Sequence, residues 1–258
     1  MSGAATGDSR PDEPEPKSEP KSEPKPEPKS EPEVDVWTVP LDGSPATVAA
    51  LAGVLSPCEA ERGGRCRFAA DRRRFVVAHA ALRLILADRL DVPPEEVRLR
   101  RGRHGKPRLA GGSDLRFNLS HSGDLALVAV SRYDEVGVDV DRLRPGLPVE
   151  PLAERFFPAS EARFVAEAAG PTERAGRFLR LWTRKEAVVK AAGGRLVQGL
   201  GLAVCGADGV VRDPSGQLRG AWSVLDLPVP DGHRAALAVA GPTAPRISVR
   251  RADPGRAR

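Results

Sequence analysis

Apolar residues recur with two different spacings along this chain, and the spacings predict both helices and strands. Helical spacing predicts α-helices over 70–90, 159–169 and 172–192, and Ser44 is a suitable N-cap for a helix beginning at 45. The Gly- and Pro-containing stretch GRHGKPRL (102–109) predicts a loop. Short runs rich in apolar and β-branched residues predict strands at 34–39, 115–120, 125–131, 135–141, 201–205, 209–212, 221–226, 235–240 and 246–250.

The order of these elements predicts an α+β protein built from two similar halves. Helices followed by strands occur twice, and the two blocks meet at a hinge near 142–148. We therefore expect an N-terminal half at 34–142 and a C-terminal half at 143–258. No internal sequence repeat relates the two halves, so the expected similarity depends on the family resemblance described below.

Residues 1–33 have a different composition from the rest of the chain. They cycle through KSEP and KPEP with almost no apolar side chain, so they cannot bury enough surface to offset the entropy of ordering. This composition predicts a disordered, partly polyproline-II tail that acts as a solvating linker rather than as a docking peptide.

The charge of the chain is unevenly distributed. The whole chain carries +5 at pH 7, with −4 in residues 1–33 and therefore +9 in residues 34–258. A positive excess suits an anionic partner such as a nucleic acid, a nucleotide or an acidic protein. No apolar run is long enough to span a bilayer, so we expect a cytoplasmic protein without membrane contact. The scattered cysteines lack CxxC spacing and predict free thiols: Cys58, Cys66 and Cys205.

Lysine is rare after the tail. Residues 34–258 contain 32 arginines but only the lysines at 106, 185 and 190. A lysine ammonium is a compact point charge, whereas a guanidinium is a planar fork, so retained lysines suggest sites where the fork does not fit. Lys106 lies in the motif HGKP, where an ordinary loop is an equally good interpretation.

Two carboxylates share one face of the predicted strand VGVDVD (136–141). Side chains alternate along a strand, so Asp139 and Asp141 lie on the face opposite to the three valines. Adjacent carboxylates repel each other unless a cation or a proton lies between them. The pattern fits a metal site, but it equally fits a hydrated strand end.

The helix segment WTRKEAVVK (182–190) places four residues on one stripe. Phe178, Trp182, Glu186 and Lys190 are spaced by four, so the stripe is apolar at its start and charged at its end. The charged end fits either a site or an ordinary ion pair of about 0.3–0.5 kcal/mol. Lys185 points about 100° away from Glu186 and is expected to order neighbouring structure or substrate.

The motif FNLSHSG (117–123) places hydroxyl groups and an imidazole at one point. Ser120, His121 and Ser122 lead from a strand into a glycine turn, and such a turn can hold a phosphate. The serines lack the GxSxG context of a nucleophile elbow, and Walker and GxGxxG patterns are absent from the sequence. His79 and His233 are expected to be structural, and His104 stays undecided.

These motifs occur in the order HGKP, FNLSHSG, GVDVD, FFPASE and LWTRKEAVVK, and this ordered set resembles the surfactin-type 4′-phosphopantetheinyl transferases. The resemblance runs from about residue 55 to about residue 200. It implies two similar α/β halves with coenzyme A and Mg²⁺ between them. The implied reaction moves the phosphopantetheine arm of coenzyme A to a serine of an apo acyl or peptidyl carrier protein and releases adenosine 3′,5′-bisphosphate.

The resemblance also implies the roles of individual residues. Asp139, Asp141 and Glu186 correspond to the metal ligands, and Lys190 corresponds to the lysine on the coenzyme A phosphates. Glu186 could in addition act as general base on the carrier serine. Four further residues correspond to the 3′-phosphoadenosine end of the coenzyme A site: Arg74, Lys106, Ser120 and His121.

Two positions depart from the family pattern. Asp141 stands where the family commonly has Glu, so its carboxylate reaches less far and a water could bridge it to the metal. Pro158 stands where Ser or Thr is frequent, so the capping box with Glu161 is lost, although proline suits a first helical turn.

Two other classes of function are compatible with parts of the sequence. A Mg²⁺-dependent nuclease or phosphohydrolase could use the same three acids. A non-enzymatic nucleic-acid binder would suit the positive charge, but aromatic residues are only 4% of the chain, which is a poor supply for base stacking. We therefore expect a transferase that acts as a monomer on an acidic carrier protein and binds neither nucleic acid nor membrane.

Overall fold

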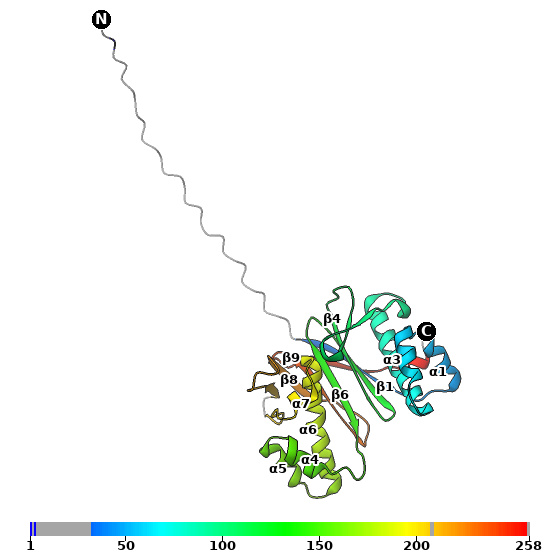
Figure 1. The fold of residues 1–258 in the computed structure, drawn as a ribbon, viewed down its shortest axis with the longest axis vertical. Helices are drawn as coiled ribbons and strands as arrows, with labels where there is room; N and C mark the ends of the chain where they lie inside the picture. The colour runs from blue at the N-terminus through cyan, green and yellow to red at the C-terminus, as the bar shows by residue number, and fades with distance from the viewer. Residues whose placement is uncertain (2, 4–31, 207–208, 257–258) are drawn as a thin grey trace. The chain divides into compact units, whose positions relative to one another are not determined.

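The computed structural model describes residues 1, 3, 32–206 and 209–256. The tail predicted at 1–33 falls largely outside the described residues. The described chain is a mixed α+β protein, which confirms the predicted fold class (Figure 1). The predicted hinge segment after residue 142 leads directly into a helix that begins at Val149.

The N-terminal part of the chain forms a four-stranded sheet, a small hairpin and a long helix. Strand order in the sheet is β10-β1-β5-β4, with β1 antiparallel to β5 and parallel to β10. The elements are β1 (Glu33–Pro40), α1 (Pro45–Ala52), α2 (Pro57–Gly64), α3 (Ala69–Leu90), η1 (Pro94–Glu96), β2 (Leu99–Arg101), η2 (Arg103–Gly105), β3 (Pro107–Leu109), β4 (Leu115–Ser122) and β5 (Leu125–Arg132).

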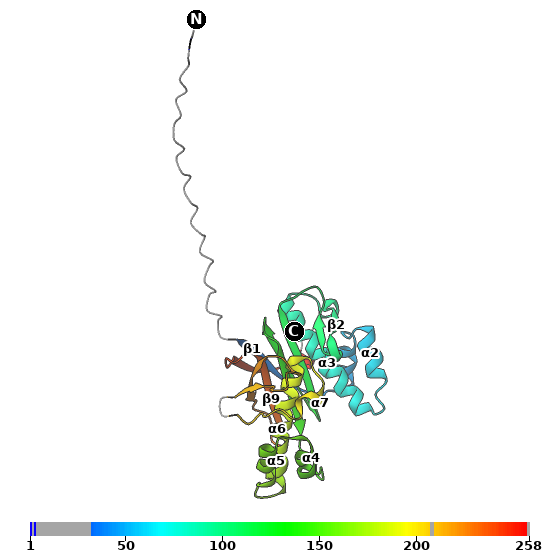
Figure 2. The ribbon, with the colours of Figure 1, turned by 60° about the vertical axis from the view of Figure 1, so that its left-hand side comes forward.

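The C-terminal part forms a second four-stranded sheet in the order β6-β9-β8-β7. Figures 1 and 2 both show α4 and α5 packed together at one end of the long helix α6. The elements are β6 (Val136–Arg142), α4 (Val149–Phe156), α5 (Ala159–Ala166), α6 (Pro171–Ala192), α7 (Leu196–Gly199), β7 (Val210–Arg212), β8 (Ala221–Asp226), β9 (His233–Ala240), β10 (Arg246–Arg251) and η3 (Pro254–Arg256).

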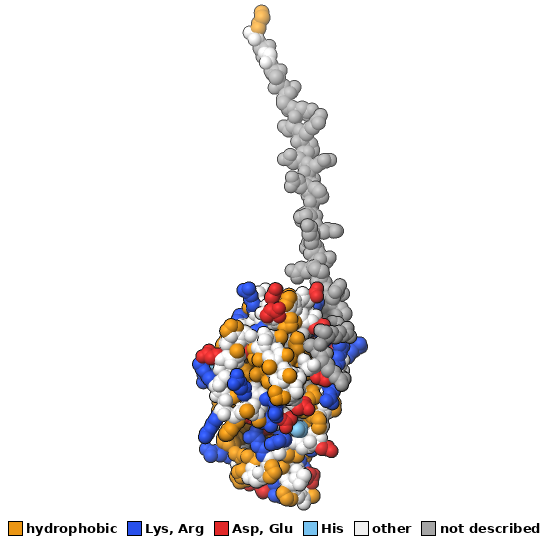
Figure 3. Space-filling model, turned by 90° about the vertical axis from the view of Figure 1, so that its right-hand side faces the viewer, with side chains coloured by type: hydrophobic (Ala, Val, Ile, Leu, Met, Phe, Trp, Pro, Cys, Tyr) orange, Lys and Arg blue, Asp and Glu red, His pale blue; other side chains and the backbone are white. Residues whose placement is uncertain are grey.

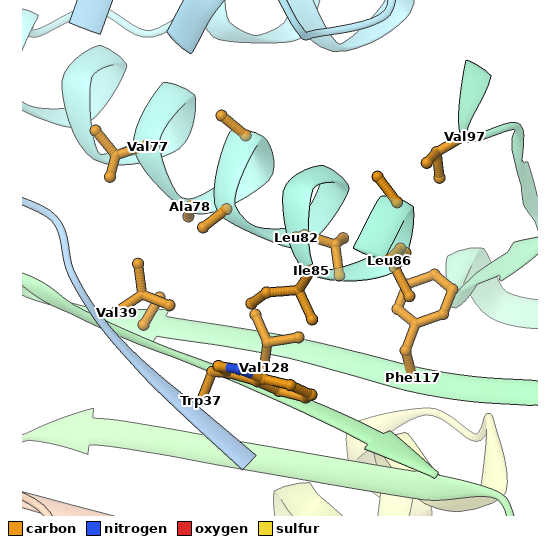
Figure 4. Close-up of a cluster of buried hydrophobic side chains, with 14 of the residues drawn as sticks. Trp37, Val39, Val77, Ala78, Leu82, Ile85, Leu86, Val97, Phe117 and Val128 are labelled. Carbon is orange, nitrogen blue, oxygen red and sulfur yellow. The ribbon is translucent and has the colours of Figure 1, made fainter. Parts of the chain in front are cut away.

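Three apolar cores arrange these elements in four layers. The first core lies between α3 and its sheet, where Leu82 and Leu86 face Trp37, Phe117 and other strand residues (Figure 4). The second core lies between α6 and the β6-β9-β8-β7 sheet. The third joins the inner faces of the two sheets through Val34, Val36, Leu125, Leu127, Ala129, Val136, Val138, Val140, Ala235, Leu237 and Val239. The layer order is therefore α3, first sheet, second sheet, α6.

Strand pairing crosses the boundary that we predicted between the halves. β6 lies before residue 143, yet it pairs with β9 from Val136↔Val239 to Arg142↔His233. β10 comes from the end of the chain, yet it pairs with β1. The two sheets exchange strands in this way, and the division at 142/143 stays a prediction.

Two local predictions are corrected by the structure. The segment 201–205 is not a strand, because its Val204 and Cys205 N–H groups bond to the side chain of Glu161 instead of to a neighbouring strand. The segment 102–109 is only partly a loop, because Pro107–Leu109 pairs with Leu99–Arg101.

Candidate active site at the junction of β4, β6 and α6

Gly137 allows α6 to lie directly on β6. A Cβ atom at this position would lie 2.1 Å from the carbonyl oxygen of Ala187 and 2.3 Å from the backbone nitrogen of Ala191. Only glycine permits such an approach of helix and strand. Asp139 follows two positions later on the same face of β6, so it lies against the same helix.

The predicted stripe of α6 is present. The rings of Phe178 and Trp182 stack with centroids 5.9 Å apart, and Lys190 forms the far end of the stripe. Lys190 donates from Nζ to Oδ1 of Asp139 at 2.6 Å and to Oγ of Ser120 at 3.0 Å. The apolar start anchors the helix in the second core, and the charged end reaches the junction of the two sheets.

Ser120 and Asp139 complete a compact polar group around Lys190. Ser120 Oγ donates to Asp139 Oδ1 at 2.8 Å, and both residues are buried. The structure thus brings together three predicted site residues from three elements: β4, β6 and α6. The cation and the hydroxyl group both bond to Oδ1 of this carboxylate, and these contacts compensate for the burial of its charge.

Alternate polar residues of β4 connect the two sheets. Asn118 Oδ1 accepts from the Val138 N–H at 2.9 Å, and Ser120 Oγ accepts from the Val140 N–H at 3.3 Å. Ser122 Oγ continues the series by accepting from the next alternate N–H, that of residue 142, at 3.2 Å. Alternate side chains of the motif FNLSHS therefore accept hydrogen bonds from the backbone N–H groups at the edge of β6. Its serines lie in a strand rather than in the following turn.

Asp141 lies at the exposed end of the same row. Its Oδ1 atom accepts from Ser122 Oγ at 2.6 Å and from its neighbour's backbone N–H at 2.8 Å, and Arg144 lies 3.3 Å away. Because Ser122 and the backbone hold this short side chain, Asp141 has a fixed direction despite standing where the family commonly has Glu.

Glu186 lies between these groups without a direct partner. Within the described part of the chain, its carboxylate forms neither a hydrogen bond nor an ion pair. Burial raises the pKa of Glu186 above its ordinary value; the nearby Lys190 opposes this effect, and the charges of Asp139 and Asp141 add to it. An added cation near these carboxylates would relieve their mutual repulsion.

The three acids have the chemistry to bind a hard cation, but their positions do not form a complete coordination site. Carboxylate oxygens are the ligands that Mg²⁺ prefers. Among the described residues, however, no group of three His, Cys, Asp or Glu side chains lies close enough to hold a metal. Lys190 and Ser122 each contact the Oδ1 atom of their aspartate, so a cation would compete with these contacts or bind the other carboxylate oxygen.

His121 and Arg74 lie on the open side of this group. Arg74 donates to Asp124 at 2.9 Å and to Asp71 at 3.1 Å, and these bonds raise its pKa. Loss of hydration on the protein side of the ring, together with the charges of Lys190 and Arg74, lowers the pKa of His121. The charges of Arg74 and Lys190 thus both act on His121 and favour its uncharged form.

Lys106 makes its contacts away from His121 and Arg74. Its Nζ donates to Glu135 at 2.8 Å and to the backbone carbonyls of Val136 and Ala191 at 3.0 and 3.2 Å. All three ammonium donors thus hold the beginning of β6 to the end of α6. Burial lowers the pKa of Lys106, while Glu135 opposes the effect. Its assignment to the coenzyme A site stays a prediction.

Asn118 was not expected among the site-forming residues, and Ser122 was expected in a phosphate-holding turn rather than in the strand. The alternation of polar residues in FNLSHS was the available signal, since every second side chain of a strand shares a face. A hollow of about 450 Å³ opens beside this motif, between α2, α3 and the β2–β3 hairpin. Its lining includes Arg62, Arg83, Arg98, Arg100, Arg101, His79, Pro107 and Leu119.

Fold and site together define a class of protein: two α/β parts in one chain, with acids and a lysine where a strand and a helix meet. The family model described as 4′-phosphopantetheinyl transferase, N-terminal, matches residues 42–133. The model described as 4′-phosphopantetheinyl transferase superfamily matches residues 135–228. The chain belongs to the 4′-phosphopantetheinyl transferase superfamily.

Individual relatives support this membership. The chain is 38% identical over 217 residues to the 4′-phosphopantetheinyl transferase HetI of Nostoc sp., which covers 81% of this chain and 88% of the relative. It is 34% identical over 167 residues to a putative 4′-phosphopantetheinyl transferase of Synechocystis sp., covering 64% and 67%. It is 31% identical over 151 residues to the L-aminoadipate-semialdehyde dehydrogenase-phosphopantetheinyl transferase of Xenopus laevis, covering 54% and 49%.

Proposed function

We propose that this chain transfers the 4′-phosphopantetheine arm of coenzyme A to a serine of an apo carrier protein, at the junction of β4, β6 and α6. The serine oxygen forms a bond to the phosphorus that carries the pantetheine arm. The bond from that phosphorus to the bridging oxygen breaks, and adenosine 3′,5′-bisphosphate leaves. The serine proton passes to a base. The observation that carries the proposal is the Lys190–Asp139–Ser120 group beside Glu186, in a chain of this family.

Lys190 is the expected phosphate contact. Its ammonium is presented by α6 and is only partly buried, so it can turn from Asp139 to a diphosphate oxygen. Phosphoryl transfer depends mainly on positioning and on neutralising charge. An ammonium at this point would neutralise charge on the leaving bisphosphate.

Asp139, Asp141 and Glu186 are the expected holders of Mg²⁺. When bound, Mg²⁺ would supply charge neutralisation at the diphosphate. The raised pKa of Glu186 also suits this carboxylate to accept the proton of the carrier serine. Asp141 is held by Ser122 in a direction from which it can contribute a single oxygen or a water-bridged contact.

The adenosine end of coenzyme A is expected near Arg74, His121 and the arginine-lined hollow. The hollow of about 450 Å³ opens beside Leu119 and Pro107, next to the FNLSHS and HGKP motifs. Guanidinium groups bind phosphate oxygens in a bidentate manner. His121 is exposed on the face of β4 opposite to Ser120, and together with Arg74 it suits the 3′-phosphate.

The partner is expected to be an acidic acyl or peptidyl carrier protein, and the enzyme is expected to act as a cytoplasmic monomer without nucleic acid or membrane contact. Figure 3 shows basic side chains spread over one face of the molecule with acidic ones between them, which suits an acidic partner better than one continuous phosphate backbone. No helix of the described residues is long and apolar enough to cross a membrane.

Intact-mass spectrometry tests the proposal. Purified chain, Mg²⁺ and coenzyme A should add about 340 Da to an apo carrier protein, the mass of the transferred arm. Acyl and peptidyl carrier proteins should be screened in parallel. Incubation with single- and double-stranded nucleic acid tests the alternative of a metal-dependent nuclease or phosphohydrolase. Cleavage without any carrier modification would favour that alternative.

A further inference from the structure

Lys185 and Glu161 form a buried ion pair on the side of α6 that faces away from the candidate active site. Lys185 is 0% exposed and Glu161 is 2% exposed, and Nζ lies 2.6 Å from Oε2. Lys185 thus lies next to Glu186 in the sequence but belongs to a different environment.

The pair connects three segments of the C-terminal part. Glu161 lies in the first turn of α5, and its Oε1 accepts from the backbone N–H groups of Val204 at 2.5 Å and Cys205 at 3.1 Å. Lys185 Nζ donates to the carbonyl of Leu202 and lies 4.6 Å from the centre of the Phe157 ring. α5, α6 and segment 202–205 therefore meet at one pair of charges.

This arrangement is not needed for stability alone. Removing two charges from water is unfavourable, and well-packed apolar residues of similar size are often as stable or more stable. Burial lowers the pKa of Lys185, which shows the same unfavourable desolvation, while Glu161 opposes it. Compared with an apolar pair, the ion pair restricts the orientation of the two side chains, because its hydrogen bonds require fixed positions of the donor and acceptor atoms.

The orientation of these side chains matters because α6 lies directly on β6. Gly137 lets the helix lie directly on β6, and Gly199 lets the following segment approach equally closely, since a Cβ there would lie 2.2 Å from Cγ2 of Val189. Adjacent helix residues differ by about 100° around the axis. A rotation of α6 would therefore turn Lys185 out of its pocket and Glu186 away from β6 together.

We propose that the Lys185–Glu161 ion pair is a positioning device that sets the rotation of α6 and so holds Glu186 toward Asp139 and Asp141. The assignment rests on the proposed function for the role of Glu186. It also gives a reason for lysine at this position. The pocket offers a carboxylate, a carbonyl and an aromatic face to a point charge, and a guanidinium would bring more N–H donors than the pocket has acceptors.

The test replaces both charges at once, with Lys185→Met and Glu161→Gln in one chain. The glutamine keeps an oxygen for Val204 and Cys205, and neither residue is left as an unpaired buried charge. We expect this double variant to fold, kcat for carrier modification to fall about tenfold or more, and KM for coenzyme A to stay within about twofold. Binding of Mg²⁺ to the free protein, measured by calorimetry, should weaken by about tenfold.

The control removes an ion pair within α6 whose arginine also contacts α5. Arg177 pairs with Glu173 at 2.6 Å and donates to the carbonyl of Phe164 in α5. Arg177→Met with Glu173→Gln should leave kcat and Mg²⁺ binding unchanged. Lys185→Arg is a second test, because it keeps the charge; we expect it to fold and to lose about tenfold in kcat.

The outcomes separate this inference from the proposed function. Wild-type rates and wild-type Mg²⁺ binding in the double variant, or in Lys185→Arg, would overturn the positioning role. Weakened Mg²⁺ binding in the double variant supports the positioning role even where the wild-type chain modifies no carrier protein. In that case only the proposed function fails.

Discussion

The ammonium of Lys190 lies 2.6 Å from Oδ1 of Asp139, and this ion pair joins α6 to β6. The group that we expect to bind the diphosphate is thus held, without ligand, by a carboxylate that we expect to bind Mg²⁺. Each neutralises the other in a partly buried place where an unpaired charge would be unfavourable. Binding of coenzyme A and a cation would give each group a new partner of opposite charge.

Lys190→Ala should lower kcat for carrier modification by about 100-fold or more, because it removes a charge that stabilises the leaving bisphosphate. Steady-state kinetics with an apo carrier protein measures the effect. Arg250→Ala is the control, since it removes an exposed positive charge of β10, paired with Asp35 of β1, and should leave the rate unchanged. An equal loss in both variants would mean that overall charge, not the site, determines the rate.

Gly137→Ala should destabilise the fold by about 3 kcal/mol or more, because the added methyl group would meet the Ala187 carbonyl oxygen at 2.1 Å. Urea unfolding gives the change in free energy. Gly64→Ala is the control: nothing lies within 4 Å of a Cβ there, and alanine is the better helix former. A normal stability of Gly137→Ala would contradict the close approach of α6 and β6.

Asn118→Ala should destabilise the fold by about 1–3 kcal/mol, because it leaves the buried Val138 N–H without its acceptor. The same unfolding experiment applies, and amide hydrogen exchange at Val138 should become faster. Arg116→Ala on the same strand is the control, since the side-chain contacts of Arg116 in the described chain are with neighbouring carbonyls and with the partly buried Glu135. An unchanged exchange rate at Val138 would contradict the connection between β4 and β6.

The apolar spacing was sufficient to predict the elements with strong patterns. α3 and α6 were expected at 70–90 and 172–192 and occur at Ala69–Leu90 and Pro171–Ala192. α2 was missed because PCEAERGG has little apolar periodicity, although Ser56 and Glu59 form a capping box that could have indicated it. The strand predicted at 201–205 was wrong because a distant carboxylate takes its N–H groups.

The site residues could be predicted only where their relation to one another follows from their spacing within one motif. The spacing of Glu186 and Lys190 and the alternation of Asp139 and Asp141 are local and follow from helix and strand periods. The choice of lysine at 185 depends on Glu161, which is 24 positions earlier, and on Leu202. Such tertiary partners leave no trace in local periodicity.

Acidification below the ordinary pKa of histidine should destabilise the fold partly through His79. Burial lowers its pKa from 6.5 to about 4, and its ring stacks on Phe75 at 3.8 Å. The folded state binds a proton less readily than the unfolded state, so stability present above pH 6.5 is lost as the pH falls toward 4. The loss attributable to His79 is at most about 3 kcal/mol.

Urea unfolding of the wild type and of His79→Phe at pH 7 and pH 4.5 measures this contribution. The difference in stability between the two pH values should be smaller in the variant. His104→Asn is the control, because asparagine also suits the left-handed backbone at this position, and the exposed His104 has one side-chain hydrogen bond among the described residues, from Arg195. A wild-type pH dependence in His79→Phe would exclude His79 as the cause.

The central claim is that Glu186, with the two aspartates of β6 and Lys190, carries out the transfer. The most direct measurement is a time course of the intact mass of an apo carrier protein with coenzyme A and Mg²⁺, for the wild type and for Glu186→Gln. We expect a gain of about 340 Da with the wild type and, over the same period, no gain with a folded Glu186→Gln. Modification by Glu186→Gln at the wild-type rate, or no modification of acyl and peptidyl carrier proteins by the wild type, would contradict it.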